Sequence, residues 1–439
     1  GYIAVDENDR LLVPFRTWRN NITGPAADEL TRLFDWPIPQ RWSIAHLYQA
    51  ILNGEDHVAE VRRITTLAGY VHWKLTGRWS IGVGDASGMF PVDPETGAWD
   101  RGMLDAFDEH VADHGFPWRL QDILPEIVPV GEAAGSLSES GAAVLDPAGR
   151  LEAGIPLCPP EGDAGTGMVV TNAVRPKTGN VSAGTSVFAM LVLEHKLSRA
   201  HSEIDLVLTP DGNLVGMAHS NNCTSDFNAW MALFGEVAHA LGARVSESDL
   251  FETLMPLALK GDPDAGGLLS YGYISGEHLT GFSEGRPLFA RLPGASFTLA
   301  NFVRAHLFSA LGALRTGLDV LTGEEGVQVE ELVGHGGFFK TGTVGQRIMA
   351  AATATPVSVP ATAGEGGSWG MALLAAFLVR EQPDACLPEF LDAVIGVSIG
   401  EPVETRAEDV EVFNRFFRRY TAGLPIEAAA VDTMKEDAS

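Results

Sequence analysis

An acidic residue on a glycine-rich segment is the clearest candidate for chemistry in this sequence. Asp163 lies in the segment Gly162–Gly167, which reads GDAGTG. Glycines allow a carboxylate to be placed at a cleft without steric cost. Phosphoryl transfer to a hydroxyl group needs such a carboxylate to accept the proton. An Asp before a helical run is also a common N-cap, and taken alone the segment favours the cap.

Two other segments offer backbone N–H groups that could hold a phosphate. Gly184 and Thr185 lie in a predicted turn, SAGTS, directly after a predicted strand. Gly336 and Gly337 lie in VGHGGFFK, between an apolar strand and a helix, with Lys340 at the end of the segment. Neither segment is a P-loop or a GxGxxG fingerprint. A plain hairpin turn explains the first segment more simply, and close packing explains the second equally well.

Two further segments are weaker candidates. Phe15–Asn21 places Trp18 beside the amide of Asn20 and two guanidinium groups, a combination that suits a polyol. An exposed strand end would have the same composition. Gly364–Ala372 is rich in glycine at a helix entrance, where close helix packing is the simpler explanation for the glycines inside the helix.

The elements that must position these residues follow from hydrophobic periodicity and from glycine and proline signals. Strands alternate with helices, which predicts an α/β fold. The expected helices are 43–52, 58–75, 224–241, 299–321, 346–353, 369–379 and 410–420, and the expected strands are 179–183, 187–193, 327–334 and two within 204–217. Residues 84–88 are expected to form a loop.

Composition excludes several classes of function. The chain has 439 residues, of which 45% are hydrophobic, so it is long enough for two or three domains with a real core. A net charge of -27 repels nucleic-acid phosphates, although a local positive field can still bind ATP. No apolar stretch is long enough to span a bilayer. The 3 cysteines lie far apart, which predicts reduced thiols in a cytoplasmic protein, and no metal-ligand spacing predicts a zinc site.

The order of the motifs is more specific than any one of them. Together they resemble the FGGY family of carbohydrate kinases, which includes xylulokinase, ribulokinase and glycerol kinase. The segments that carry the resemblance are 4–18, 70–77 with 84–88, 124–135, Gly162–Asp163, Gly184–Ser186, 273–277 with 303–305, and Gly336–Gly337 with Gln346.

The resemblance implies a two-domain actin-like, ribonuclease H-like ATPase fold with a central cleft. A sugar-binding domain would span residues 1–158 and a nucleotide-binding domain 159–439, with the last helices packing back toward the first domain. It also implies that ATP, with Mg²⁺, phosphorylates a small ketose such as xylulose or ribulose. Asp163 would be the general base, and Trp18, Asn20 and Asp163 would bind the sugar. Gly184, Thr185, Gly336, Gly337 and Lys340 would bind the nucleotide.

The chain departs from the family pattern in two places. The family's Trp-x-Asp-x-Arg sugar segment reads Trp18-Arg19-Asn20-Asn21-Ile22 here, so an uncommon ketose stays open. The family's opening strand–turn–strand unit, which cups the transferred phosphate, is not found. We therefore expect an incomplete first domain with an unpaired sheet edge, and at most trace activity for a polypeptide that begins at Gly1. An unpaired edge invites association, so a homodimer is one expected assembly. The alternative to a kinase is an inactive relative that binds a sugar or a nucleotide and regulates another process.

Overall fold

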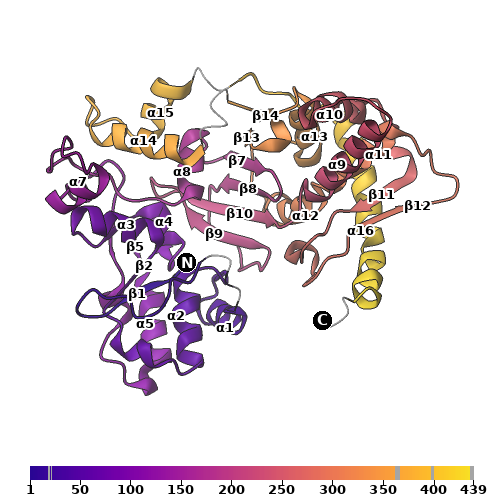
Figure 1. Ribbon diagram of the computed structural model, residues 1–439. Helices are drawn as coiled ribbons and strands as arrows, with labels where there is room; N and C mark the ends of the chain where they lie inside the picture. The colour runs from indigo at the N-terminus through magenta and orange to yellow at the C-terminus, as the bar shows by residue number, and fades with distance from the viewer. Residues whose placement is uncertain (18–19, 21, 361–365, 397–399, 436–439) are drawn as a thin grey trace. The chain divides into compact units, whose positions relative to one another are not determined.

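The computed structural model describes residues 1–17, 20, 22–360, 366–396 and 400–435 (Figure 1). Contacts within the chain divide it into two compact units. Unit 1 comprises Gly1–Pro176, Val192–Gly216 and Glu365–Val397, and unit 2 comprises Lys177–Leu191, Met217–Gly364 and Ser398–Ser439. The boundary expected between residues 158 and 159 stays a prediction, because contact density defines compact units and not independently folding domains.

Unit 1 consists of short strands and helices. Its strands form three two-stranded pairs, β1 (Ile3–Val5) with β2 (Arg63–Thr65), β3 (Ser80–Gly82) with β6 (Glu126–Val128), and β4 (Val92–Asp93) with β5 (Ala98–Trp99). Its helices are α1 (Gly24–Phe34), α2 (Ser43–Leu52), α3 (Leu67–Thr76), α4 (Val83–Ser87), α5 (Arg101–His110), α6 (Leu120–Ile123), α7 (Glu139–Leu145), α8 (Asp163–Val170), α14 (Gly366–Leu378) and α15 (Leu387–Ile395). Strand β9 (Ile204–Leu208) also belongs to this unit.

Unit 2 is built around the larger sheet, in which strands follow the order β14-β13-β7-β8-β10. These strands are β7 (Thr178–Ala183), β8 (Val187–Val192), β10 (Leu214–Ser220), which begins in unit 1 beside β9, β13 (Glu331–His335) and β14 (Val357–Ser358). A second pair joins β11 (Leu268–Tyr271) to β12 (Leu288–Arg291). The helices are α9 (Ser225–Ala240), α10 (Glu247–Leu254), α11 (Leu299–Ser309), α12 (Gly312–Asp319), α13 (Val344–Thr353) and α16 (Ala407–Thr433).

The register of the larger sheet decides where the chain's turns lie. Strand β7 pairs antiparallel with β8, with Ala183 opposite Val187, and parallel with β13, with Ser182 opposite His335. Because β7 and β13 run in the same direction, the residues that follow each strand lie at the same edge of the sheet. The turn after β7 and the glycines after β13 are therefore neighbours.

Three sequence-based expectations about secondary structure are wrong. Residues 84–88, expected to be a loop, are mostly in helix α4. The helix expected over 58–75 is confined to Leu67–Thr76, because residues before it form strand β2. The single helix expected over 299–321 is broken at residues 310–311, between α11 and α12. The break allows Gly312 to lie under the ring of Tyr420, where a Cβ atom would be only 2.4 Å from Cζ.

Helices α8 and α14 pack closely within unit 1, as small residues allow (Figure 1). A Cβ atom on Gly370 would lie 2.3 Å from the carbonyl oxygen of Thr166. At Gly367 it would lie 2.9 Å from the Thr166 hydroxyl oxygen. Close helix packing, the simpler explanation of the glycines inside this helix, is therefore confirmed.

The mixture of helices and strands confirms the expected α/β class. Among the residues that the structure describes, no helix is both long enough and apolar enough to cross a lipid bilayer.

Candidate functional site: a carboxyl cluster and a hairpin turn

Asp163 is the first residue of helix α8, and its side chain is exposed. The N-cap position is taken by Gly162, whose backbone is extended, so Asp163 is not the cap that its sequence context favours. Within the described part of the chain, no hydrogen bond or ion pair engages the Asp163 carboxylate. An exposed, unengaged carboxylate at a helix start can accept a proton from a bound hydroxyl group.

Two buried or partly buried carboxyl groups lie beside the Asp163 segment. The side chain of Glu161 is 9% exposed, and it accepts hydrogen bonds from the backbone N–H groups of Gly84 (3.1 Å) and Asp85 (2.8 Å). Asp85 accepts a hydrogen bond of 2.5 Å from the Thr66 hydroxyl group. A Cβ atom on Gly162 would lie 3.1 Å from Asp85 Oδ1, so the Asp85 carboxyl group approaches the backbone directly before Asp163.

Glycines make room for this cluster. A Cβ atom on Gly82 would lie 2.2 Å from Glu161 Oε1, and one on Gly84 would lie 2.5 Å from Glu161 Oε2. Any larger residue at either position would displace the Glu161 carboxyl group. The two glycines therefore pack directly against the Glu161 carboxyl group, although Glu161 is far from them in the sequence.

Burial shifts the titration of both neighbouring acids. Burial, and after it the nearby Asp85 charge, raise the pKa of Glu161 to about 8, while the hydrogen bonds from the N–H groups of Gly84 and Asp85 oppose the shift. The pKa of Asp85 is raised to about 6, chiefly by burial and in smaller part by Asp163, while the Thr66 hydrogen bond opposes the shift. Glu161 is thus mainly protonated and uncharged at neutral pH, which reduces the negative charge close to the Asp163 carboxylate.

In unit 2 the predicted turn is a tight hairpin between β7 and β8. The N–H of Gly184 donates to the carbonyl oxygen of Ser186 (2.9 Å), which closes the turn. The carbonyl oxygen of Gly184 accepts bonds from the N–H (3.1 Å) and the hydroxyl group (2.7 Å) of Thr224. The carbonyl oxygen of Thr185 accepts from the N–H of Cys223 (2.9 Å).

These bonds orient the N–H groups of the turn. In a trans peptide the C=O and the following N–H point in opposite directions. Because the carbonyl groups of Gly184 and Thr185 are held by residues 223–224, the N–H groups of Thr185 and Ser186 point away from that segment. Thr185 is itself exposed. The turn therefore offers two aligned N–H donors and a hydroxyl group, a suitable combination for an anion.

Gly336 lies directly against this turn. Its φ is 101°, which favours glycine, and a Cβ atom there would be 2.4 Å from the carbonyl oxygen of Ala183. A Cβ atom on Gly337 would meet no atom within 4 Å. The structure thus brings Gly184, Thr185, Gly336 and Gly337 together at one edge of the sheet, as two separate motifs in the sequence predict.

The remaining predicted residues are less well supported. Trp18 lies outside the described residues. The Asn20 side chain accepts a bond from the N–H of Ile22 (3.2 Å), a local turn contact. Lys340 is exposed at the end of the short helix Gly337–Phe339. The side chain of Gln346 donates to the carbonyl oxygen of Val357 (3.2 Å) and so ties α13 to β14.

Sequence reasoning missed the residues that surround the two centres. Glu161 is only two residues from Asp163, but a single Glu in a proline-rich segment gives no signal of burial. Thr224 follows a strand, as many unremarkable threonines do. What makes each of them important is a partner that is distant in the sequence, and no local pattern reports it.

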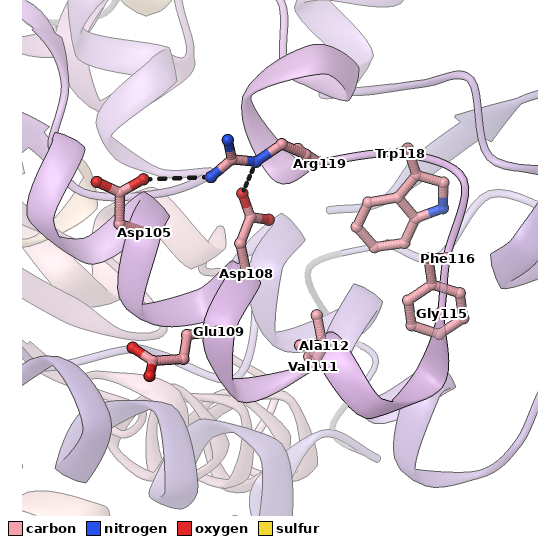
Figure 2. Close-up of a pocket in the computed structure, with 9 residues that line it drawn as sticks. All are labelled: Asp105, Asp108, Glu109, Val111, Ala112, Gly115, Phe116, Trp118 and Arg119. Carbon is pink, nitrogen blue, oxygen red and sulfur yellow. Dashed lines mark hydrogen bonds and ion pairs between the residues drawn. The ribbon is translucent and has the colours of Figure 1, made fainter.

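A hollow of about 370 Å³ lies elsewhere in unit 1 (Figure 2). Its wall includes Arg119, which is paired with Asp108 (3.0 Å) and Asp105 (3.4 Å). The rings of Phe116 and Trp118 stack beside it with centroids 4.9 Å apart. None of the predicted site residues lines this hollow, and Arg119, the one cationic residue that lines it, is already ion-paired, so we do not include the hollow in the candidate site.

Comparison with known proteins matches part of the chain to one family. Residues 179–379 match the C-terminal domain of the FGGY family of carbohydrate kinases. A xylulose kinase of Haemophilus influenzae is 24% identical over 334 residues, which are 73% of this chain and 62% of that protein. The chain therefore spans less than two thirds of the length of this curated relative.

Solved structures show the same fold. A ligand-bound xylulose kinase from Lactobacillus acidophilus superimposes with a TM-score of 0.76 at 15% identity, covering 98% of this chain and 83% of that one. A glycerol kinase from Plasmodium falciparum, solved with ADP, superimposes with a TM-score of 0.72 at 16% identity, covering 99% and 82%. The actin-like, ribonuclease H-like fold expected from the sequence is thus confirmed.

Proposed function

We propose that this chain is part of a carbohydrate kinase of the FGGY family, whose C-terminal domain it matches over residues 179–379, and that the protein transfers the γ-phosphoryl group of ATP directly to a hydroxyl group of a small ketose. Asp163 is the general base in this proposal. The observation that carries it is the exposed carboxylate at the start of α8, which has no hydrogen-bond or ion-pair partner among the described residues.

The role of Asp163 rests on its surroundings. The attacking hydroxyl group must lose a proton as the new bond to phosphorus forms, and an ionised carboxylate within hydrogen-bonding distance accepts it. Asp163 has no competing partner among the described residues. The neighbouring carboxyl groups of Glu161 and Asp85 are buried or partly buried and already accept hydrogen bonds from the protein. Asp163 is therefore the acid that is best placed to contact a substrate.

The role of ATP rests on the hairpin turn. The N–H groups of Thr185 and Ser186, with the Thr185 hydroxyl group, are suited to phosphate oxygens. Gly336 and Gly337 let a nucleotide approach the backbone beside that turn. Lys340 adds a positive charge at the end of the same segment.

A ketopentose is the proposed acceptor, and xylulose the first to test. The curated relative is named a xylulose kinase. The glycerol kinase structure shows that the fold also serves a smaller polyol. Trp18 and Asn20 remain proposed sugar contacts.

Mg²⁺ would accompany ATP in this reaction. Such an ion usually takes several ligands from phosphate oxygens and water, with one or two protein carboxylates. No group of three His, Cys, Asp or Glu residues in the described ranges could hold a metal by itself. Mg²⁺ would therefore arrive with the nucleotide and neutralise phosphate charge, while the residues described above position the reactants.

The test is a coupled ADP-release assay on the full-length protein with a panel of ketoses and polyols. We expect turnover with at least one ketopentose. Asp163→Asn should lower kcat by ~10²–10⁴-fold, because general-base assistance is worth about that much. ATP binding by calorimetry should be unchanged.

A matched control is Glu139→Gln. Glu139 is also an exposed acid at the first position of a helix in unit 1. It should leave kcat unaltered. Wild-type activity in Asp163→Asn would sink the assignment of the base, whereas binding of ATP and a ketose without any turnover in the unaltered protein would identify an inactive relative.

A further inference from the structure

Glu277 is a buried acid that the proposed reaction does not use. Its side chain is 0% exposed and lies in the loop after β11. Burial raises its pKa. Burying a carboxyl group is costly unless its hydrogen bonds are replaced, so its partners show what it stabilises.

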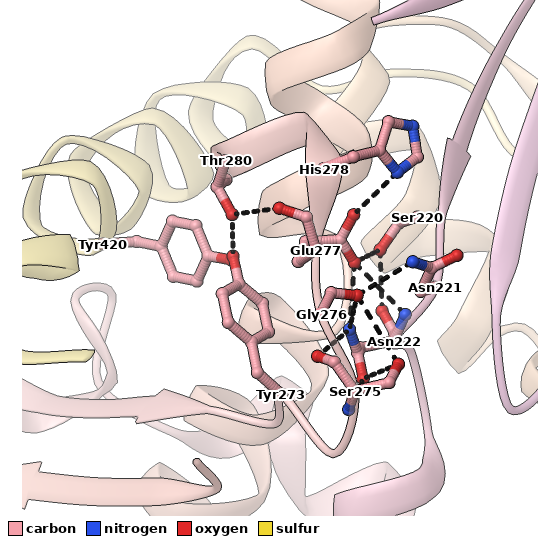
Figure 3. A network of polar contacts seen from close by, with 10 residues as sticks. All are labelled: Ser220, Asn221, Asn222, Tyr273, Ser275, Gly276, Glu277, His278, Thr280 and Tyr420. Carbon is pink, nitrogen blue, oxygen red and sulfur yellow. Dashed lines mark hydrogen bonds and ion pairs between the residues drawn. The ribbon is translucent and has the colours of Figure 1, made fainter. Parts of the chain in front are cut away.

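All three hydrogen bonds to the Glu277 side chain go to one of its oxygen atoms (Figure 3). Its Oε2 accepts from the hydroxyl group of Ser220 (2.8 Å), from the N–H of Asn222 (3.2 Å) and from Asn222 Nδ2 (3.1 Å). The other oxygen, Oε1, is buried and makes no hydrogen bond with the residues that the structure describes; His278 Nδ1 lies 3.9 Å away. Glu277 thus holds the end of β10 and the residues that follow it.

Asn222 extends the network in the other direction. Its Oδ1 accepts from the N–H groups of Ile274 (3.0 Å) and Ser275 (3.1 Å), and its Nδ2 also donates to the carbonyl oxygen of Ser275 (3.2 Å). The Asn222 side chain is 5% exposed. These bonds join residues 220–222 firmly to the loop that carries Glu277.

The residues directly after Asn222 hold the hairpin turn. The N–H of Cys223 donates to the carbonyl oxygen of Thr185, and the N–H and hydroxyl groups of Thr224 donate to that of Gly184. These are the bonds that aim the N–H groups of Thr185 and Ser186 outward. Hydrogen bonds from Glu277 to Asn222, the backbone of residues 222–224 and the hydrogen bonds of Cys223 and Thr224 therefore connect Glu277 to the turn, entirely within unit 2.

We propose that Glu277 is a positioning residue for the phosphate groups of the nucleotide. It acts by fixing residues 222–224, which in turn hold the carbonyl groups of the turn and keep its N–H donors aligned. This inference rests on the proposed function, because it takes the turn to be the phosphate contact. It goes beyond that function in making a buried acid, which acts through residues 222–224, responsible for affinity toward phosphate.

The geometry predicts which substitutions matter. Because every side-chain bond ends on Oε2, Glu277→Gln can keep all three with its amide oxygen and place its amide nitrogen where Oε1 now lies without a hydrogen bond among the described residues, 3.9 Å from His278 Nδ1. Glu277→Ala removes all three. We therefore expect Glu277→Gln to resemble the wild type and Glu277→Ala to lose affinity for phosphate.

The experiment measures the Kd values of ATP, ADP and adenosine by calorimetry on the full-length protein. Glu277→Ala should weaken ATP and ADP on the order of tenfold, the usual size of a lost hydrogen-bond contribution. Adenosine should bind as it does to the wild type. Glu277→Gln should restore the values for ATP and ADP.

Glu427→Ala is the matched control. Glu427 is also 0% exposed and lies in unit 2, where it accepts a bond from the N–H of Arg286 (2.6 Å) and none from residues 220–225. It should lower stability without distinguishing ATP from adenosine. If Glu277→Ala does not fold, Thr224→Val, which deletes one donor to the Gly184 carbonyl group, should weaken ATP selectively and by a smaller factor.

The outcomes separate the inference from the proposed function. Equal weakening of ATP and adenosine in Glu277→Ala, or unchanged ATP affinity in both Glu277→Ala and Thr224→Val, would overturn the positioning role. A wild-type protein that binds no adenine nucleotide would instead overturn the proposed function.

Discussion

The two candidate regions of this molecule use different physical means. In unit 1, three carboxyl groups lie on or beside the start of α8, and burial raises the pKa values of two of them, Glu161 and Asp85. In unit 2, the turn after β7 offers backbone N–H groups, which do not titrate near neutral pH. Chemistry in unit 1 should therefore respond to pH and charge, whereas binding in unit 2 should respond to backbone conformation.

The comparison also shows two ways to stabilise a site from a distance. Glu161 receives N–H groups at the start of α4, and Glu277 receives them from residues after β10. In each unit a buried acid joins segments that are distant in the sequence. Glu161 lies beside the exposed carboxylate of Asp163. Glu277 supports the turn at Gly184, whose carbonyl groups accept hydrogen bonds from residues 223–224.

The largest effect is expected at Gly336. Gly336→Ala places a Cβ atom 2.4 Å from the Ala183 carbonyl oxygen, in a backbone region that only glycine adopts readily. The strain costs about 1–3 kcal/mol and overpacking about 1–3 kcal/mol more. Urea denaturation should show this loss together with weaker ATP binding.

Gly337→Ala is the control for that substitution. Its Cβ atom would meet nothing within 4 Å, so stability should be retained while the KM for ATP rises. Equal stability of the two variants would contradict the expectation that the backbone conformation and close contact at Gly336 require glycine.

The next effect concerns pH and belongs to unit 1. Burial raises the pKa of Glu161 from 4.5 to about 8, so folding favours its protonated form. Its contribution to stability is complete below pH 4.5 and is lost as pH rises through about 8. The free energy of unfolding of the wild type, relative to Glu161→Gln, should fall by up to about 1.4 kcal/mol per pH unit in that window.

The quantity to compare is this slope and not the absolute stability of Glu161→Gln. The new side-chain NH2 group would face a backbone N–H donor, which destabilises the variant at every pH. Chemical denaturation between pH 5 and pH 9 measures it. Parallel profiles for the two proteins would contradict the raised pKa. The same comparison for Glu277→Gln tests whether unit 2 shares the behaviour.

The smallest effect is expected at Thr66. Its hydroxyl group donates to Asp85 and also accepts from the N–H of Gly69, where it caps α3. Thr66→Val should cost about 1 kcal/mol for each bond. Because the donated bond favours ionised Asp85, whose pKa is about 6, the loss should be greater at pH 8 than at pH 5. Thr66→Ser, which keeps the hydroxyl group, should behave as the wild type at both pH values.

Local patterns predicted much of unit 2. The strands near 179–183 and 187–193 and the helix near 346–353 are present, because each is an uninterrupted apolar or amphipathic run beside a clear turn signal. The two glycine-rich motifs proposed to bind phosphate were recognisable for the same reason. That they meet follows from the parallel pairing of β7 with β13, which joins residues that no local pattern connects.

Unit 1 shows where local reasoning stops. Gly84 and Gly88 predict a loop over residues 84–88, yet Val83–Ser87 is helical. The cause is Glu161, which is 77 residues away from Gly84 and satisfies the N–H groups at the start of that helix. Local propensity disfavours the helix, and a distant hydrogen-bond acceptor reverses the balance.

The sequence by itself determined the α/β class, the family resemblance, the acid at position 163 and the glycine-rich turns, because these depend on residue types and short spacings. Only the tertiary structure decided that Asp163 is exposed and has no partner among the described residues, that Glu161 and Asp85 are its neighbours, and that Glu277 supports the turn at Gly184. Burial and long-range hydrogen bonds exist only once distant segments pack together, and they set the pKa values and the direction of each N–H group.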